Sequence, residues 1–473
     1  MLNVSITPHR EFLPADTPDQ RLFIMLKLRP TREVAQTRPS TTFVFLIDTS
    51  GSMYEIVAGD FQPTGETYIQ DGKKYTRVVG GIAKIDMVIE SLRTLINSGR
   101  FTPEDRIALI QFDDQASTLI GLTPVTQTRQ LEDAIAKLRN FSGGTCMGRG
   151  INQALALLAN QSMTSRHTMI FTDGDTFDED DCQNLAQQFA SQGISITALG
   201  VGEFNENLLT DISGKTGGHC RHIVPGTASG NDVSITDLPN LLLADYQQAQ
   251  QEVINNLVLS LKTVQGVKLL RVTRVYPDLA EFSLNQAPYP IGAAKAKDET
   301  IFILEFAIDS RPSSKIRLAQ LGLTYDIPGL NRRGELLPQN VVVQFVPGQG
   351  GTAQVDQEVM GYVQQRNISQ LVDDATRMAE SNPQQAEKLL ETARRITVQI
   401  GNDAMLESLN EGIEELRKTR QISSGTRKTV KMGSRGKTVK MGDDLNDDLS
   451  EETIRKLTGT WADFLHQVRQ QWD

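Results

Sequence analysis

The chain has few of the residues that build disulfide or zinc frameworks. Its 473 residues include 3 cysteines, 5 histidines and 2 tryptophans. Cys146, Cys182 and Cys220 are odd in number, widely spaced and without a C-x-x-C pair, which argues against a disulfide scaffold and favours reduced thiols in a cytosol. The run from His219 to His222 lacks partners at zinc-finger spacing, so we interpret it as the last strand of an α/β domain and its approach.

Long apolar runs are absent as well. No stretch approaches the ~18 consecutive apolar residues of a membrane span, and no basic segment followed by an apolar one opens the chain, so we expect no secretory signal. The formal net charge of −10 argues against a nucleic-acid partner. These absences predict a cytoplasmic protein, and its length predicts about two to four domains.

A set of oxygen-bearing side chains follows strand-like runs or lies in a glycine-rich loop. The set comprises Asp48, Ser50 and Ser52 after the apolar run 43–47, Thr145 in the loop 141–148, and Asp173 after the run 167–172. Oxygen ligands of this kind suit hard divalent cations such as Mg²⁺. Because one carboxylate and two hydroxyls leave such a cation under-neutralised, it still seeks an anionic ligand, and another protein can supply it.

This set resembles the metal-ion-dependent adhesion site of von Willebrand factor A (VWA) domains. The resemblance implies that Ser50, Ser52 and Thr145 contact the cation directly. It implies that Asp48 and Asp173 act through water or through hydrogen bonds to the ligating hydroxyls. Mg²⁺ is the expected cofactor, with Mn²⁺ or Ca²⁺ as alternatives, and the sixth position is expected to accept a Glu or Asp of a partner.

Residues 41–228 alternate between strand and helix patterns, which predicts a doubly wound, Rossmann-like α/β domain with a mainly parallel sheet. The expected strands are 43–47, 106–112, 168–171, 194–199 and 221–223, with an antiparallel edge strand at 117–122. Ligands bind such sheets at the carboxyl ends of the strands. The loops that carry Asp48, Thr145 and Asp173, the candidate metal loops, are expected at these ends.

Residues 54–80 depart from the VWA pattern, because they separate the serine loop from the first helix. Asp71-Gly72 between β-prone runs predicts a hairpin there. Two interpretations stay open for it: a partner-specificity element at the metal face, or a surface decoration.

Residues 250–346 have the pattern of short strands separated by turn residues, which predicts a β-sandwich. Residues 1–36 also alternate like strands and have little to pair with alone. We therefore expect both segments to form one sandwich into which the VWA domain is inserted. A phase change near Ala319-Gln320 predicts a bulge.

Three helical stripes in residues 354–420 predict a small bundle, and we favour a structural spacer over a peptide-binding groove. Pro383 is expected at the start of the second helix, and Gly401 at its end.

A basic segment within residues 421–449 contains the hexamer KTVKMG twice, starting at Lys428 and Lys437, and an acidic run follows. This composition predicts a mobile linker. Thr429 and Thr438 resemble sites of a basic-directed Ser/Thr kinase and the phosphothreonine motifs read by forkhead-associated (FHA) domains. The alternatives are a solvated linker, or a patch for nucleic acid or anionic lipid that the acidic run disfavours.

Residues 450–473 predict an amphipathic helix that carries both tryptophans. Trp461 and Trp472 belong to its apolar stripe. The stripe is expected to dock onto a partner as a helix in a groove or onto the chain's own body.

In its overall organisation the chain resembles bacterial cytosolic VWA proteins linked to Ser/Thr kinase and FHA signalling. The leading hypothesis is a non-enzymatic adaptor that binds a partner's acidic side chain through the metal. The alternative is an accessory subunit of a MoxR- or chelatase-type AAA+ ATPase, since the chain has no G-x-x-x-x-G-K-[ST] loop. An enzyme is disfavoured because no general base is placed near the site, and an RNA-binding VWA protein is disfavoured by the acidic balance.

Overall fold

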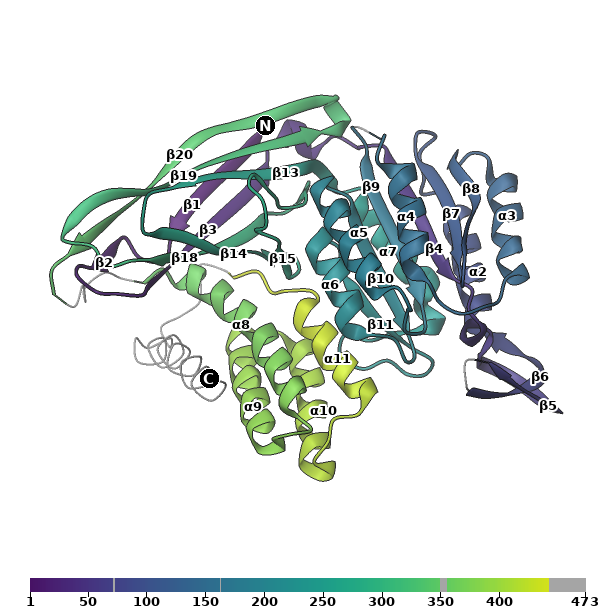
Figure 1. Ribbon diagram of the computed structural model, residues 1–473. Coiled ribbons are helices and arrows are strands. Elements are labelled where there is room, and N and C mark those ends of the chain that lie inside the picture. The colour runs from purple at the N-terminus through teal and green to yellow at the C-terminus, as the bar shows by residue number, and fades with distance from the viewer. Residues whose placement is uncertain (71–72, 162, 349–354, 442–473) are drawn as a thin grey trace.

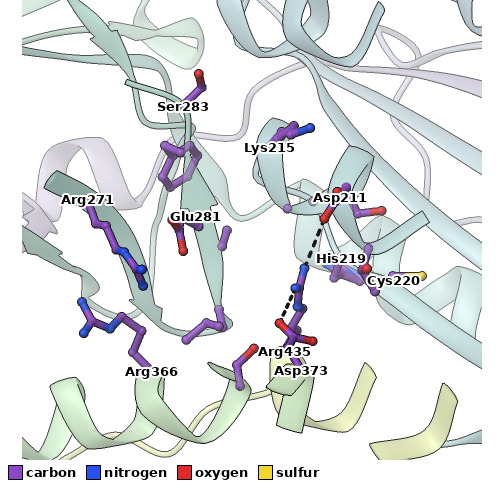
Figure 2. Close-up of a pocket in the computed structure, with 18 of the residues that line it drawn as sticks. Asp211, Lys215, His219, Cys220, Arg271, Glu281, Ser283, Arg366, Asp373 and Arg435 are labelled. Carbon is purple, nitrogen blue, oxygen red and sulfur yellow. Dashed lines mark hydrogen bonds and ion pairs between the residues drawn. The ribbon is translucent and has the colours of Figure 1, made fainter. Parts of the chain in front are cut away.

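The protein consists of a β-sandwich, an α/β domain and a helical domain (Figure 1). The computed structural model describes residues 1–70, 73–161, 163–348 and 355–441. The three bodies meet around a cavity of about 580 Å³ (Figure 2). No described helix is long and apolar enough to cross a membrane, and all three cysteines are free thiols. The predicted C-terminal helix with Trp461 and Trp472 lies outside the described residues.

The α/β domain is built on a seven-stranded sheet in the order β12-β11-β10-β9-β4-β7-β8. Its strands are β4 (Thr41–Asp48), β7 (Arg106–Phe112), β8 (Ala116–Pro124), β9 (Ser165–Thr172), β10 (Ser195–Val201), β11 (Cys220–Val224) and β12 (Val233–Ser234). Neighbouring strands are parallel except β7 and β8. The predicted doubly wound sheet and its antiparallel edge strand are therefore confirmed.

Helices cover both faces of this sheet. They are α2 (Lys84–Ile96), α3 (Thr128–Ala136) and α7 (Leu238–Ala249) on one face, and α4 (Met147–Leu158), α5 (Glu179–Ser191) and α6 (Glu206–Thr216) on the other. Because side chains alternate along a strand, Phe43 and Phe45 of β4 pack under the first group while Val44 and Leu46 pack under the second. The central strand is thus buried on both faces, as parallel sheets require.

The insertion after the serine loop is the expected hairpin. A short 3₁₀ turn, η1 (Gly51–Tyr54), leads into β5 (Ile56–Gln70), which pairs antiparallel with β6 (Lys73–Ala83). The hairpin projects away from the α/β domain beside η1 (Figure 1), and in the described part of the chain its strands pair only with each other. Its predicted turn at 71–72 lies outside the described residues.

The sandwich contains strands from both sides of the α/β domain. One sheet has the order β1-β3-β18-β14-β15 and the other β16-β13-β19-β20-β2, with β17 beside β13. The N-terminal strands are β1 (Leu2–Pro8), β2 (Phe12–Pro14) and β3 (Gln20–Pro30), followed by the short helix α1 (Arg32–Ala35). The later strands are β13 (Glu252–Thr263), β14 (Val267–Tyr276), β15 (Ala280–Phe282), β16 (Tyr289–Pro290), β17 (Ala294–Lys295), β18 (Thr300–Ile308), β19 (Ser314–Ile327) and β20 (Arg332–Val346). The α/β domain is therefore inserted into the sandwich, as predicted.

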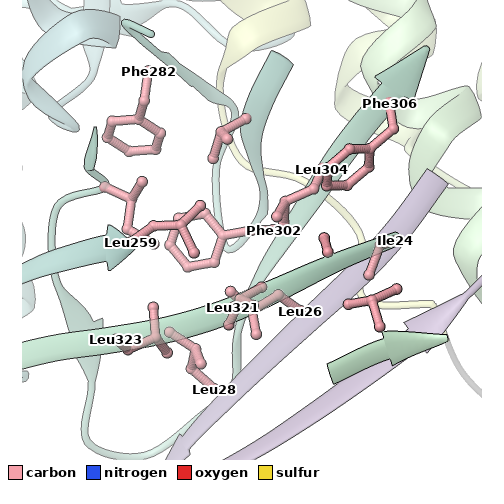
Figure 3. Close-up of a cluster of buried hydrophobic side chains, with 14 of the residues drawn as sticks. Ile24, Leu26, Leu28, Leu259, Phe282, Phe302, Leu304, Phe306, Leu321 and Leu323 are labelled. Carbon is pink, nitrogen blue, oxygen red and sulfur yellow. The ribbon is translucent and has the colours of Figure 1, made fainter. Parts of the chain in front are cut away.

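The sheet containing β3 is buried on both faces. Ile24 and Leu26 point into the sandwich core (Figure 3), whereas Phe23 and Met25 pack against the helical domain. The predicted bulge lies one residue earlier than expected, at Leu318, where the register between β19 and β20 shifts.

The helical domain contains one helix more than the sequence predicts. α8 (Gln357–Met378), α9 (Pro383–Ile400) and α10 (Asp403–Thr419) match the predicted bundle, and α11 (Ser424–Arg435) follows. The prediction that 421–449 is a mobile linker is wrong for 424–441. This segment is polar in composition, but it contains an amphipathic helix whose basic side chains pair with acidic side chains from distant elements.

The first hexamer copy lies in α11, against the α/β domain. The Lys428 side chain is only 1% exposed. Its ammonium donates to the carbonyl of Gly202 at 2.8 Å, pairs with Glu203 at 3.1 Å and lies 4.7 Å from the ring centre of Phe204. Arg427 pairs with Glu206 at 2.6 Å. The loop after β10 and the start of α6 therefore neutralise the helix's charges.

The second copy has an extended conformation. The backbone of Lys437 pairs with that of Asp278 in an isolated antiparallel β-bridge. The Val439 amide donates to Gln365 at 2.9 Å, and the Met441 amide donates to the Tyr362 hydroxyl at 3.1 Å. Met441 is buried in the core that joins the helical domain to the sandwich. The same hexamer thus forms a helix in one place and an extended segment in the other.

Equivalent substitutions in the two copies are expected to differ in effect. Lys428→Met removes the donor to the Gly202 carbonyl and the ion pair with Glu203 from a side chain that is 1% exposed, so the free energy of unfolding should fall by about 2 kcal/mol. Lys437 is exposed, so Lys437→Met should change it by less than about 0.5 kcal/mol. Urea denaturation of both variants measures the difference, and equal effects would contradict the described docking of α11.

Candidate functional site

The site begins with Asp48, the last residue of β4. Its carboxylate is fully buried and accepts two hydrogen bonds, from the Ser50 amide at 2.8 Å and from the Thr172 hydroxyl at 2.6 Å. Thr172 ends β9, the parallel neighbour of β4. Asp48 therefore fixes the turn of its own loop and joins it to the next strand end.

The hydroxyls of Ser50 and Ser52 lie side by side at the start of η1. Their oxygens are 3.1 Å apart, and the Ser52 hydroxyl donates to Oδ1 of Asp173 at 2.7 Å. Two adjacent oxygens of an octahedral Mg²⁺ site, each about 2.1 Å from the ion, lie about 3.0 Å apart. The serine spacing therefore fits two neighbouring ligands of one ion.

Thr145 reaches the same region on a second loop. The Gly51 amide donates to the Gly143 carbonyl at 3.1 Å, which ties this loop to the serine loop. A Cβ at Gly143 or Gly144 would lie 2.7 or 2.5 Å from the Asp114 carboxylate, so a larger residue there would displace this exposed side chain. Thr145 is buried. It is assigned to the candidate site because these backbone contacts hold its loop against the serine loop.

Sequence reasoning missed a cation at this site. Lys84, the first residue of α2, places its ammonium 2.8 Å from Oδ2 of Asp173 and 2.5 Å from the carboxylate of Glu55. Lys84 is 5% exposed, and a Cβ on Gly202, which has a φ of +76°, would lie 3.6 Å from its ammonium. The hairpin separates Lys84 from the serine loop in sequence, so the available signal, a lone lysine before an apolar helix, was weak.

Burial shapes the electrostatics of the site. Desolvation and repulsion from Asp173 raise the pKa of Asp48 to about 7. Burial alone would lower the pKa of Lys84, but attraction and hydrogen bonding to Asp173 and Glu55 hold that pKa above its usual value. A positive charge close to Asp173 is therefore permanent at neutral pH, and a bound divalent cation would favour the charged form of Asp48.

The donors at this site are hydroxyls and carboxylates, which suits a hard cation such as Mg²⁺. Within the described residues, no cluster of three or more His, Cys, Asp or Glu side chains could hold a metal. The residues from His219 to His222 lead into and form part of β11, as expected. The structure thus brings Asp48, Ser50, Ser52 and Asp173 into one hydrogen-bonded group.

The predicted phosphorylation sites lie elsewhere and are buried. Thr429 and Thr438 are 5% and 6% exposed. The Thr429 hydroxyl donates to Asp232 at 2.7 Å. Neither threonine contacts the candidate metal loops in the described structure. A kinase could reach them only after residues 424–441 detach from the α/β domain and the sandwich.

The cavity between the three bodies is also remote from the metal loops. Its wall carries several charged side chains (Figure 2). Arg435 pairs with Asp373 at 2.8 Å and with Asp211 at 3.7 Å, and Arg366 pairs with Glu305 at 2.8 Å. These pairs neutralise part of the charge on the cavity wall.

Two family models match the chain. The model of the von Willebrand factor type A domain matches residues 43–230. The model described as the Sll0103-like, C-terminal alpha-helical domain matches residues 357–440, a range that includes α11 and most of the second hexamer copy.

Relatives of similar length are known. The Synechocystis protein sll0103 is 22% identical over 71% of this chain and 80% of its own length. A von Willebrand factor type A protein from Catenulispora acidiphila superposes with a TM-score of 0.73 at 16% identity, covering 93% of this chain and 97% of that one. The ArnB paralog VWA2 from Sulfolobus acidocaldarius gives a TM-score of 0.56 at 16% identity, covering 92% and 99%. The chain therefore contains a VWA domain, inserted in a β-sandwich and followed by a helical domain of the Sll0103-like kind.

Proposed function

We propose that the chain is a non-enzymatic adaptor that binds an acidic side chain of a partner protein through a metal ion, with Mg²⁺ preferred. VWA domains generally serve protein interaction or adhesion, which supports a binding role. One observation carries the proposal: the hydroxyls of Ser50 and Ser52 are 3.1 Å apart, and Ser52 bonds to Asp173. That arrangement suits adjacent ligands of a hard cation.

The residues have distinct parts in this proposal. Ser50, Ser52 and Thr145 would hold the cation, while Asp48 and Asp173 orient the hydroxyls and balance its charge. When bound, the cation supplies a positive centre for the partner's carboxylate. Ser52 is partly exposed whereas Asp48 is fully buried, so a partner would approach over the serine side of the site.

An exposed aromatic residue flanks that approach. Phe177 is 76% exposed, and its ring would lie 3.0 Å from a Cβ on Gly144. Its amide donates to the Thr145 carbonyl at 2.9 Å. An exposed ring beside the candidate ligands suits the apolar neighbours of a partner's acidic residue.

Mg²⁺ is expected to stabilise the wild-type protein but not Ser52→Ala. At a Mg²⁺ concentration 100 times Kd, the wild type should gain about 2.7 kcal/mol relative to the protein in EDTA. Ser52→Ala removes one ligand and should lose most of this gain. Thermal unfolding in Mg²⁺ and in EDTA measures it for each variant.

Thr49→Val is the matched control. Thr49 lies between Asp48 and Ser50 in the same loop, but its buried hydroxyl donates to Gln111 at 2.8 Å, away from Ser52. The variant should lose stability in both buffers and keep the response to Mg²⁺. A wild type without any response to Mg²⁺, Mn²⁺ or Ca²⁺ would refute the metal site. Capture of partners by immobilised protein should require Mg²⁺ and fail with Ser52→Ala.

We also propose that phosphorylation regulates the strap formed by residues 424–441. In this scheme a Ser/Thr kinase modifies Thr429 or Thr438 after the strap detaches, and an FHA-domain protein then binds the phosphothreonine. The Thr429 hydroxyl touches the Asp232 carboxylate, so a phosphate there would meet a like charge in a buried place. Phosphorylation would therefore oppose the return of α11 to its docked position.

Thr429→Glu is expected to release α11. The added carboxylate meets Asp232, which already pairs with His222 at 3.2 Å, and the docked state should weaken by about 2–4 kcal/mol. Hydrogen exchange of the α11 amides should accelerate accordingly. Thr429→Ser keeps the hydroxyl and should exchange like the wild type, while unchanged protection in Thr429→Glu would rule out release by phosphorylation of this residue.

A further inference from the structure

Lys84 connects the candidate metal site to the base of the hairpin. Glu55 precedes β5 and Lys84 follows β6, so both ends of the hairpin stand at the site. The Lys84 amide donates to the Glu55 carbonyl at 3.1 Å, and its ammonium lies between the carboxylates of Glu55 and Asp173. The side chains of these partners differ greatly in exposure: Glu55 is 58% exposed and Asp173 is 0% exposed.

The two oxygens of Asp173 have different partners. Oδ1 accepts from the Ser52 hydroxyl, and Oδ2 accepts from the Lys84 ammonium. Lys84 therefore holds the carboxylate in the rotamer that faces the serines. A lysine in this place also adds a fixed positive charge immediately behind the candidate ligands.

The Lys84 charge changes the net charge of the metal-loaded site. A divalent cation would be neutralised by the carboxylates of Asp48 and Asp173 alone. Lys84 adds one positive charge in a water-poor place, where charges interact strongly. Glu55 offsets it only in part, because its exposed carboxylate is screened by solvent. The loaded site would thus keep a net attraction for a carboxylate.

We infer that Lys84 is a built-in cation that weakens metal binding and strengthens the binding of an acidic ligand by the metal-loaded site, with Glu55 moderating both effects. The inference rests on the proposed metal-dependent function and deepens it. It makes Lys84 a positioning residue and a determinant of ligand charge. The occupant it selects is an acidic segment of a partner protein.

Substitutions at the two positions should have opposite effects on metal affinity. Mn²⁺ serves as the probe, and electron paramagnetic resonance measures the free ion during titration of the full chain. Lys84→Met should bind Mn²⁺ about tenfold more tightly than the wild type, Glu55→Gln about threefold more weakly, and Lys84→Arg within about twofold of it. Lys27→Met is the matched control, because it removes a lysine paired with Glu358 at 2.6 Å far from the site.

Acetate tests the second half of the inference. Protein-bound Mn²⁺ relaxes the methyl protons of an acetate that reaches it, which reports carboxylate binding without any partner. At equal occupancy by Mn²⁺, acetate should bind Lys84→Met at least about threefold more weakly than the wild type. A purely structural lysine would lower both affinities together and would not produce opposite signs.

The outcomes separate this inference from the proposed function. If the wild type binds Mn²⁺ and Lys84→Met binds it no more tightly, the role of Lys84 is refuted and the metal site stands. If only Lys84→Met binds Mn²⁺, the lysine has taken the place of the metal: the proposed metal function fails, and the inferred help to an acidic ligand fails with it. If neither binds, both are refuted. Should Lys84→Met fail to fold, Glu55→Gln at the exposed position still tests the direction of the change in Mn²⁺ affinity.

Discussion

The parallel pairing of β4 with β9 is the constraint on which the site depends. Ile47 stands opposite Phe171, so the two strands end at the same edge of the sheet and deliver Asp48 and Asp173 to one place. Both strands are buried on both faces, and neither can slip without exposing its apolar side chains. The short bond between Thr172 and Asp48 then joins the strand ends. The chemistry of the site is therefore fixed by the hydrophobic core beneath it.

The surrounding domains limit how this core can move. The chain enters and leaves the α/β domain through the sandwich, and the sheet containing β3 packs against the helical domain on its outer face. α11 then returns to the α/β domain at the loop that follows β10. Gly202 in that loop accepts from Lys428 on one side and lies near Lys84 on the other. α11 and Lys84 of the candidate metal site thus share Gly202 as a neighbour.

The fold was predictable where local pattern and burial agree. Strands such as β4 carry continuous apolar residues, and the D-x-S-x-S spacing located Asp48, Ser50 and Ser52 of the candidate site. Lys84 was not predictable, because its partner Asp173 lies far along the chain and only the folded sheet brings them together. The strap was mispredicted for a related reason. Its lysines and arginines indicate solvation when read locally, but Glu206 and Phe204 provide their partners only in the folded protein.

The duplicated hexamer shows how environment divides one sequence into two conformations. The helical copy has Lys428, Thr429 and Met432 buried against the α/β domain, while the extended copy leaves Lys437 and Lys440 exposed and anchors itself through Met441. The two copies therefore differ in the contacts that hold them to the rest of the protein. A protein that reads these residues as a linear motif would have to unwind α11 to bind the first copy but would find the second already extended, so two segments with one sequence present different backbone shapes.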